Sequence, residues 1–383
     1  MKQGRTLQEV ATELARQRES KRDFIVDTGA IEVTEDAGRL LLHHADDGLL
    51  DEQFGMTDLF HRQLGSSLGI PSKYYDKMQV ELPSLLSQNV NGWLRTRDSR
   101  QTIRTLDGSA RAFLSDRYRR IDNYEIATAT LPILAEMDGV MIESAEITEN
   151  RMYLKAVNKR LEAEVVPGDV VQAGVLISNS EVGLGSVSVM PLVYRLVCLN
   201  GMVICDYGQK KYHIGRRPSP PFGGAGYAAV DGFAVSSPLA ASLPLGEQET
   251  TWELFSDDTL AADDQAFMLK LRDIVRGATE AARFETIVDK LRQATGIPIL
   301  GHIPKVVELT AEQYGLNKTE ANGILQHLIT GGDLSLYGLS NAVTRASQDS
   351  DSYDRATLME SAGWRIATMP ADQWHTINEG VTL

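Results

Sequence analysis

The sequence predicts an α+β protein, with a core of a β-hairpin, a helix and an antiparallel meander, and with a mostly helical C-terminal region. Two short alternating runs, residues 101–106 and 110–115, flank Asp107-Gly108, a dipeptide that favours tight hairpin turns. Four strand-like runs separated by turn residues follow between residues 140 and 199. From residue 247 onward, apolar residues recur with a helical period.

Length and composition are those of an ordinary globular protein. The 383 residues are enough for two or three domains. Hydrophobic residues make up 43% and charged residues 23% of the chain, which is typical of soluble proteins. No apolar run approaches the length of a membrane span, and the charged N-terminus has no apolar signal core. We therefore expect a cytoplasmic protein without a membrane partner.

Changes in composition along the chain suggest four regions. They are an N-terminal helical and β region (1–90), an α+β core with a basic hairpin (91–208), a Gly/Pro-rich basic and aromatic loop or linker (209–246), and an acidic helical region (247–383).

The N-terminal region opens with a charged amphipathic helix over residues 5–22, with Leu7, Val10 and Leu14 on one side. Strand-like runs follow on either side of a turn at residues 35–38. Residues 56–78 are helical but broken at residues 69–71, in the outline of a helix-turn-helix. Since this segment carries few basic residues, a packed helical hairpin is the favoured interpretation.

Positive charge gathers around the predicted β-hairpin, in residues 93–123. With a two-residue loop, Leu106 pairs with Ser109, and Arg104 faces Arg111 across the strands. Two opposed arginines repel each other unless an anion lies between them, and a phosphate backbone is one such anion. Neutralisation by Asp98 or Asp116, or a three-residue loop that shifts the register, is the alternative.

A helix and a meander follow the hairpin. Asp122 or Asn123 can cap a helix that runs to Met137, because short polar side chains accept hydrogen bonds from the first turn. The strand-like runs after it cover residues 140–148, 151–157, 169–180 and 185–199. Short turns between consecutive strands favour antiparallel pairing.

The Gly/Pro-rich loop carries four basic residues, Lys210, Lys211, Arg216 and Arg217, interleaved with aromatic residues. A single nucleic-acid strand uses such residues through phosphate contacts and base stacking. Loops of this composition also join domains, so a linker is the slightly favoured interpretation, and the loop can serve both roles.

Acidic charge collects in the C-terminal part of the chain. The first 120 residues hold 18 basic and 18 acidic residues, whereas residues 221–383 hold 11 and 22. Within this part, residues 311–324 show the spacing of a helix-turn-helix, but its second helix offers Lys318 as the one cation. A structural helical bundle is therefore favoured over a DNA-reading motif.

Chemistry that would indicate an enzyme is not recognisable in the sequence. Cys198 and Cys205 have neither redox nor zinc spacing, so we expect two reduced, buried thiols. The seven histidines are scattered, and no phosphate loop, zinc-protease or serine-hydrolase motif occurs. We expect no catalytic residues, no cofactor and no metal.

Several ordered segments resemble the phage/plasmid-like domain-of-unknown-function family 932. They are residues 68–78, 89–94, 111–123, 177–189 and 195–203, with a further segment near residues 335–349. The resemblance implies an origin in mobile elements but no activity. The order of hairpin, helix and meander is also similar to the core of single-strand annealing recombinases of the Red-beta type, which form oligomeric rings or helices on DNA.

We therefore expect a phage or plasmid protein that binds single-stranded nucleic acid, DNA in particular, as a homo-oligomer, and that anneals strands in recombination or replication. The residues expected to contact nucleic acid are Arg95, Arg97, Arg104, Arg111, Phe113, Arg117, Tyr118, Arg119, Arg120, Lys210, Lys211, Arg216 and Arg217. The alternative is a virion or host-interaction structural protein that self-assembles without nucleic acid. An enzyme acting on nucleic acid would need a carboxylate cluster beside the basic groove.

Overall fold

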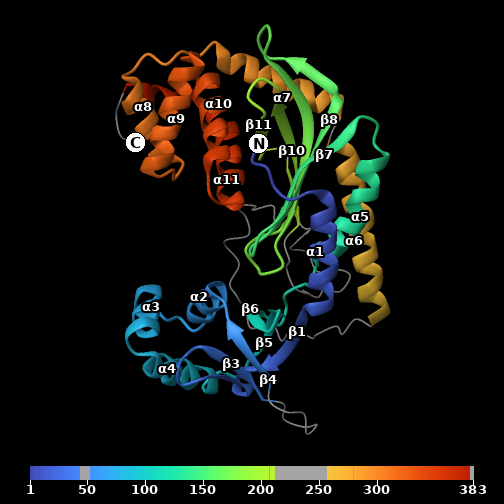
Figure 1. Cartoon of the computed structure of the whole chain (residues 1–383), viewed down its shortest axis with the longest axis vertical. Coiled ribbons are helices and arrows are strands. Elements are labelled where there is room, and N and C mark those ends of the chain that lie inside the picture. The colour runs from blue at the N-terminus through green and yellow to red at the C-terminus, as the bar shows by residue number, and fades with distance from the viewer. Residues whose placement is uncertain (44–51, 207, 212–256, 279, 380–383) are drawn as a thin grey trace, which may run out of the picture.

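The computed structural model describes residues 1–43, 52–206, 208–211, 257–278 and 280–379 (Figure 1). Its strands form two six-stranded sheets, and helices pack around both. The sheets are antiparallel apart from one short parallel pair, and the C-terminal region is helical, so the predicted α+β class is confirmed. No helix in these ranges is long and apolar enough to cross a membrane.

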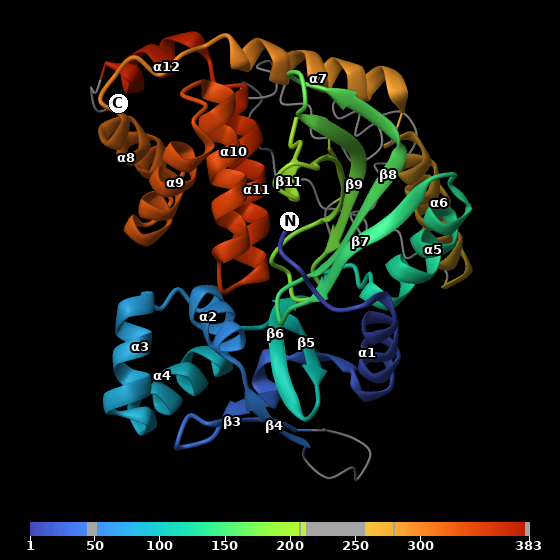
Figure 2. The same cartoon turned by 45° about the horizontal axis from the view of Figure 1, so that its top comes forward.

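The first sheet has the strand order β1-β5-β6-β4-β3-β2. Its strands are β1 (Arg22–Asp27), β2 (Ile31–Val33), β3 (Arg39–Leu42), β4 (Glu52–Met56), β5 (Arg100–Leu106) and β6 (Ser109–Ser115). Three helices pack against it, α2 (Asp58–Ser67), α3 (Ser72–Glu81) and α4 (Pro83–Arg95), as Figure 2 shows. The buried residues of this core all lie between positions 31 and 113, so the unit has a core of its own.

Local sequence signals explain several boundaries in this unit. Thr57 caps α2 through a hydrogen bond from the Phe60 amide. Gly69 follows that helix with a positive φ of 72°, and Pro71 precedes α3, which confirms the expected break. The sequence patterns do not predict β4 or α4.

The second sheet is the predicted meander, with the strand order β11-β10-β9-β8-β7 and with β12 also paired to β10. Its strands are β7 (Val140–Ile147), β8 (Met152–Glu164), β9 (Val170–Asn179), β10 (Val187–Arg195), β11 (Asn200–Val203) and β12 (Gln209–Lys211). Nearly every residue of β9 is buried. Such continuous burial requires that both faces of the sheet be covered.

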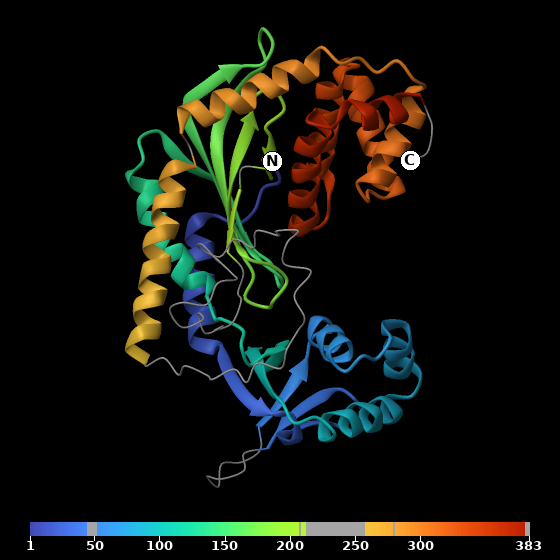
Figure 3. The ribbon, with the colours of Figure 1, turned by 180° about the vertical axis from the view of Figure 1, so that it is seen from behind.

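Helices supply that cover. One core joins the meander to α1 (Leu7–Ser20), α5 (Asn123–Glu136) and α6 (Asp257–Gly277), which lie side by side in Figure 3. Asp122, one of the two residues that the sequence offers as a cap, precedes α5 and forms a capping box with Glu125. Val10 and Leu14 of α1 are buried, but Leu7 is exposed, so the expected apolar side is shorter than predicted.

The remaining helices form the C-terminal part. They are α7 (Ala281–Thr295), α8 (Ile303–Gln313), α9 (Lys318–Gly331), α10 (Leu336–Ala346), α11 (Tyr353–Ala367) and α12 (Ala371–Asn378). A single apolar core joins them to strands of the meander. This agrees with a structural bundle for the segment around Gly315, which has the positive φ of 63° expected in a tight helix-helix turn.

The hairpin register differs from the prediction. Asp107 and Gly108 both have positive φ, and Leu106 pairs with Ser109, so the two-residue turn is confirmed. A bulge then shifts the pairing, and Arg104 lies opposite Ala112 instead of Arg111. For the same reason, Thr102 pairs with Leu114.

The hairpin belongs to the first sheet and not to the meander. Residues 22–115 therefore form a unit inserted between α1 and α5, both of which pack on the meander. The chain crosses between the two units twice, next to residue 21 and through residues 116–122, and Figure 1 shows the inserted unit below the meander. The expected region 91–208 thus contains parts of both sheets.

Candidate functional site

The predicted arginines differ in burial, and the most buried of them lies where the inserted unit meets the meander. Arg104 is 0% exposed. Its Nε lies 2.9 Å from Oδ1 of Asp23, which is its direct partner across β1 and β5. Its Nη2 donates to Asp122 Oδ1 at 2.6 Å, and its Nη1 donates to the backbone carbonyl of Glu181 at 2.9 Å. The anion that Arg104 needs is supplied by the protein.

Two further cations complete this ion-pair cluster. Lys21 Nζ lies 2.9 Å from Glu181 Oε1 and 3.0 Å from Asp122 Oδ2. Arg111 Nη2 lies 2.5 Å from Glu181 Oε2. The cluster thus sets Lys21, Arg104 and Arg111 against Asp23, Asp122 and Glu181, and the more exposed Arg120 lies 3.7 Å from Asp23 at its edge. Arg104 and Arg111 tie the inserted unit to the meander, and the expectation that they face each other across an external phosphate is wrong.

The electrostatics of the cluster favour its charged form. Burial by itself raises the pKa of the Asp122 carboxyl, but the charges of Arg104 and Lys21 outweigh it, and the pKa lies below its ordinary value. Burial also opposes ionisation of Glu181, and the charge of Arg111, followed by those of Lys21 and Arg104, holds its pKa below the ordinary value.

Three more of the predicted residues are held by other parts of the protein. Phe113 is buried, and its ring meets the Phe60 ring edge-on at a centroid distance of 5.8 Å. The Tyr118 hydroxyl donates to the backbone carbonyl of Ser180 at 3.1 Å. Arg119 forms ion pairs with two aspartates of α6, with 2.8 Å to Asp263 Oδ2. These positions fit packing roles better than contact with a strand.

Four predicted arginines remain at the surface. Arg95, Arg97 and Arg117 are exposed, and Arg120 keeps half of its side chain exposed. Arg97 donates to Ser67 Oγ at 3.1 Å, whereas Arg95 makes no hydrogen bond or ion pair among the described residues.

These exposed arginines flank the open end of the hairpin. Gln101 pairs with Ser115, so the segment before β5 lies beside the segment after β6. Arg100, 60% exposed in its side chain and 3.8 Å from Asp27, adds another cation there. Trp93, in the last turn of α4, is 53% exposed. Sequence reasoning missed Trp93, although an aromatic residue two positions before Arg95 is a usable signal.

The remaining predicted cations lie in the Gly/Pro-rich loop. Lys210 and Lys211 belong to β12, and their backbone pairs antiparallel with Ser188 and Val187. Arg216 and Arg217 lie outside the described residues.

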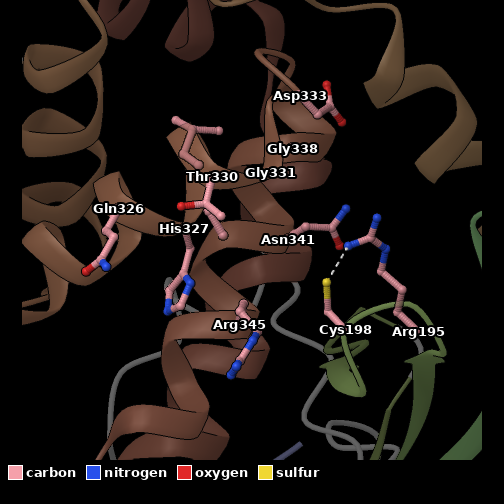
Figure 4. Close-up of a pocket in the computed structure, with 12 residues that line it drawn as sticks. Arg195, Cys198, Gln326, His327, Thr330, Gly331, Asp333, Gly338, Asn341 and Arg345 are labelled. Atoms are coloured by element: carbon pink, nitrogen blue, oxygen red, sulfur yellow. Dashed lines mark hydrogen bonds between the residues drawn. The ribbon is translucent and has the colours of Figure 1, made fainter.

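A separate cavity of about 490 Å³ lies between α9, α10 and the turn after β10 (Figure 4). Its polar wall includes Arg195, Cys198, His327, Asn341 and Arg345. Both cysteines are free, but they are half-buried, which corrects the expectation of fully buried thiols. Within the part of the chain that the structure describes, no group of three or more His, Cys, Asp or Glu side chains is placed to hold a metal ion.

Comparison with known proteins identifies one family. No curated protein and no solved structure matches the chain, so its similarity to annealing recombinases stays a prediction. Residues 112–216, which run from β6 through α5 and the meander to beyond β12, match one family model. The matching model is that of the family described as Domain of unknown function (DUF932), so this part of the chain is similar to that family.

Proposed function

We propose that the protein binds single-stranded nucleic acid, DNA in particular, at the open end of the hairpin. The observation that supports this most directly is the exposure of Trp93 in the same helical turn as the exposed Arg95. Arg97, Arg100 and Arg117 extend the cationic surface around it. The wider role, strand annealing in recombination or replication of a phage or plasmid, follows from the resemblance noted for the sequence.

Physical chemistry favours this pairing of residues. An indole ring stacks on any base, and such contacts contribute about 1–3 kcal/mol each. Arginines on the same surface neutralise phosphates. Each phosphate neutralised on a single strand adds about 0.7 to the magnitude of the slope of log affinity against log salt concentration. Because the protein carries a net charge of −14, contact is confined to such local basic surfaces.

Fluorescence gives a direct test. Trp364 and Trp374 are buried, and Trp252 lies outside the described residues. In a Trp252→Phe background, stacking on Trp93 should therefore quench emission when an oligothymidine is added at low salt. We expect Trp93→Phe to remove most of the quench, and Arg95→Glu with Arg97→Glu to weaken binding and lower the salt slope by about 0.7 for each lost phosphate contact.

Arg272→Glu is the control, and Arg95→Glu alone is its counterpart with the same change of net charge. Arg272 is exposed on α6, on the far side of the meander, and makes no hydrogen bond or ion pair within the described residues. Its substitution should leave the affinity of the Arg95/Arg97 surface unchanged apart from a small general charge effect. Unquenched emission at low salt, or equal affinities for the control and the double variant, rules out this surface.

Self-assembly is a second candidate function, which we propose because apolar side chains are exposed where α3 meets α4. Val80 is 82% exposed, and Leu82 and Leu85 lie beside it at the start of α4. Exposed apolar patches of this kind are typical of interaction surfaces. Sedimentation velocity without nucleic acid tests this role. An oligomer that is lost in the Val80→Lys with Leu82→Lys variant would support it, and a monomer in both low and high salt would exclude it.

A further inference from the structure

We propose that the cavity between α9, α10 and the β10–β11 turn binds a small phosphorylated compound. Its volume of about 490 Å³ falls in the range of small-molecule sites, roughly 300–1,000 Å³. The site is independent of the hairpin surface, because its lining residues come from the end of the meander and from the C-terminal helices.

Arg345 is the main reason for expecting an anion. It lies in the last turn of α10, is half-buried, and makes no hydrogen bond or ion pair within the described residues. Most other half-buried or buried arginines of this chain have carboxylate partners, as Arg104 and Arg195 do. A guanidinium that is partly removed from water gains most from an anionic hydrogen-bond acceptor.

Arg195 brings a second guanidinium to the same cavity. Its Nε is held by Asp169 Oδ1 at 2.6 Å, and its Nη1 makes a weaker contact with Cys198 Sγ at 3.4 Å. Asp169 also accepts from the Tyr337 hydroxyl at 2.8 Å, so the carboxylate fixes the position of the arginine. Nη2 of Arg195 has no hydrogen-bond partner among the described residues.

Two polar side chains indicate what else the ligand carries. Asn341 is only 8% exposed, and Figure 4 shows its amide beside the Arg195 guanidinium. Asp333 stands at the opposite end of the group from Arg345 in that view. A carboxylate accepts hydrogen bonds only, so a phosphate near the arginines and a hydroxyl or amino group near Asp333 would satisfy both ends.

Cys198 offers a readout inside the cavity. It lines the wall, is half-buried, and is one of only two cysteines in the protein. In a Cys205→Ser background, its reaction rate with a maleimide can be measured with and without inorganic phosphate or adenosine monophosphate, at equal ionic strength. Because a bound ligand covers the thiol, a concentration ten times the Kd should slow the reaction about tenfold.

Two further variants decide the role of the arginine. Arg345→Gln should abolish the protection of Cys198 by ligand. Its rate of maleimide modification without ligand, and its midpoint of thermal unfolding, should stay close to those of the parent. Arg272→Gln, the same change at an exposed position on α6, should leave the protection intact. If neither phosphate nor the nucleotide slows modification of the parent, or if Arg345→Gln is protected equally well, the proposal is wrong. If Arg345→Gln fails to fold, Arg345→Lys, which keeps the charge but loses the planar fork, should show reduced protection.

Discussion

Arg104 is completely buried, and its guanidinium is shared by the side chains of Asp23 and Asp122 and the backbone carbonyl of Glu181. The sequence identifies it as one of eight arginines in a basic stretch. Burial reverses its expected meaning, because an arginine removed from water with its own carboxylates has no capacity left for a phosphate. Arg104, buried and ion-paired, therefore has a structural role, whereas Arg95, exposed and without a partner among the described residues, is available to a ligand.

Removal of the Arg104 charge should be strongly destabilising. Arg104→Met leaves the half-buried carboxylates of Asp23 and Asp122 with fewer cations, and we expect the free energy of unfolding to fall by about 3–5 kcal/mol. Urea unfolding measures this change. Arg95→Met, at an exposed and unpaired position, should stay within about 0.5 kcal/mol of the parent. Equal stability of the two variants would contradict the assigned role of the cluster.

The same cluster predicts acid sensitivity. The pKa values of Asp122 and Glu181 are lowered in the folded protein, whereas ordinary values for these carboxyls are about 3.9 and 4.3. The folded state therefore binds fewer protons than the unfolded state at low pH. Stability from these two groups is complete above about pH 5 and is lost as the pH falls through their folded pKa values.

One neighbouring carboxyl acts in the opposite direction. Burial raises the pKa of Glu125, so its protonation favours the folded state as the pH falls. Glu13, whose pKa the Arg16 side chain lowers to about 2, adds to the loss from Asp122 and Glu181. We therefore expect the free energy of unfolding to fall on acidification, as urea unfolding between about pH 7 and 3 would measure. A free energy of unfolding that rises steadily on acidification would contradict this sign.

At the scale of secondary structure, the hairpin shows how far local signals reach. Asp107-Gly108 produces the two-residue turn because both positions need positive φ. The bulge between Arg104 and Thr105 then changes which residues face each other. Its effect is to place Ile103 opposite Phe113, and both side chains fill the core of the inserted unit.

A pair of glycine substitutions tests the turn. Gly108 has a φ of 72° with open space around it, so Gly108→Ala should cost about 1–2 kcal/mol through backbone strain alone. Gly92 lies inside α4, also with open space, and Gly92→Ala should stabilise by about 0.5–1 kcal/mol because alanine favours helix. Thermal unfolding should show shifts of opposite sign, and shifts of the same sign would contradict the turn geometry.

At the scale of the whole molecule, buried ion pairs lie where separate parts of the chain meet. The cluster around Arg104 joins the inserted unit to the meander. On the other side of the meander, Lys155 Nζ lies 2.6 Å from Glu360 Oε2 of α11, and both side chains are fully buried. Lys155 also lies 4.5 Å from the centre of the Tyr353 ring. The C-terminal helices are therefore anchored to the sheet by a charge pair as well as by apolar packing.

A double-mutant cycle measures this anchor. Lys155→Met or Glu360→Leu alone leaves one buried, unpaired charge and should lower the free energy of unfolding by about 3–5 kcal/mol. The double variant replaces the pair with apolar groups and should recover most of that loss. Urea unfolding gives the coupling energy, and strictly additive losses would show that the pair does not act as a unit.

The sequence by itself determined the features that depend on neighbouring residues. Local conformational preferences or short periodicities account for the Asp107-Gly108 turn, the cap before α5, the strands of the meander and the helical C-terminal region. The resemblance to family 932 is supported by the family model over residues 112–216.

Only the tertiary structure decided which charges are free to bind. Asp23 reaches Arg104 because β1 pairs with β5, and Glu181 reaches Arg111 from the end of the meander. These partners lie 81 and 70 positions apart in the sequence. These ion pairs form because the chain passes twice between its two units and buries the surfaces where the units meet. Local conformational preference predicts neither the path of the chain nor the surfaces that become buried.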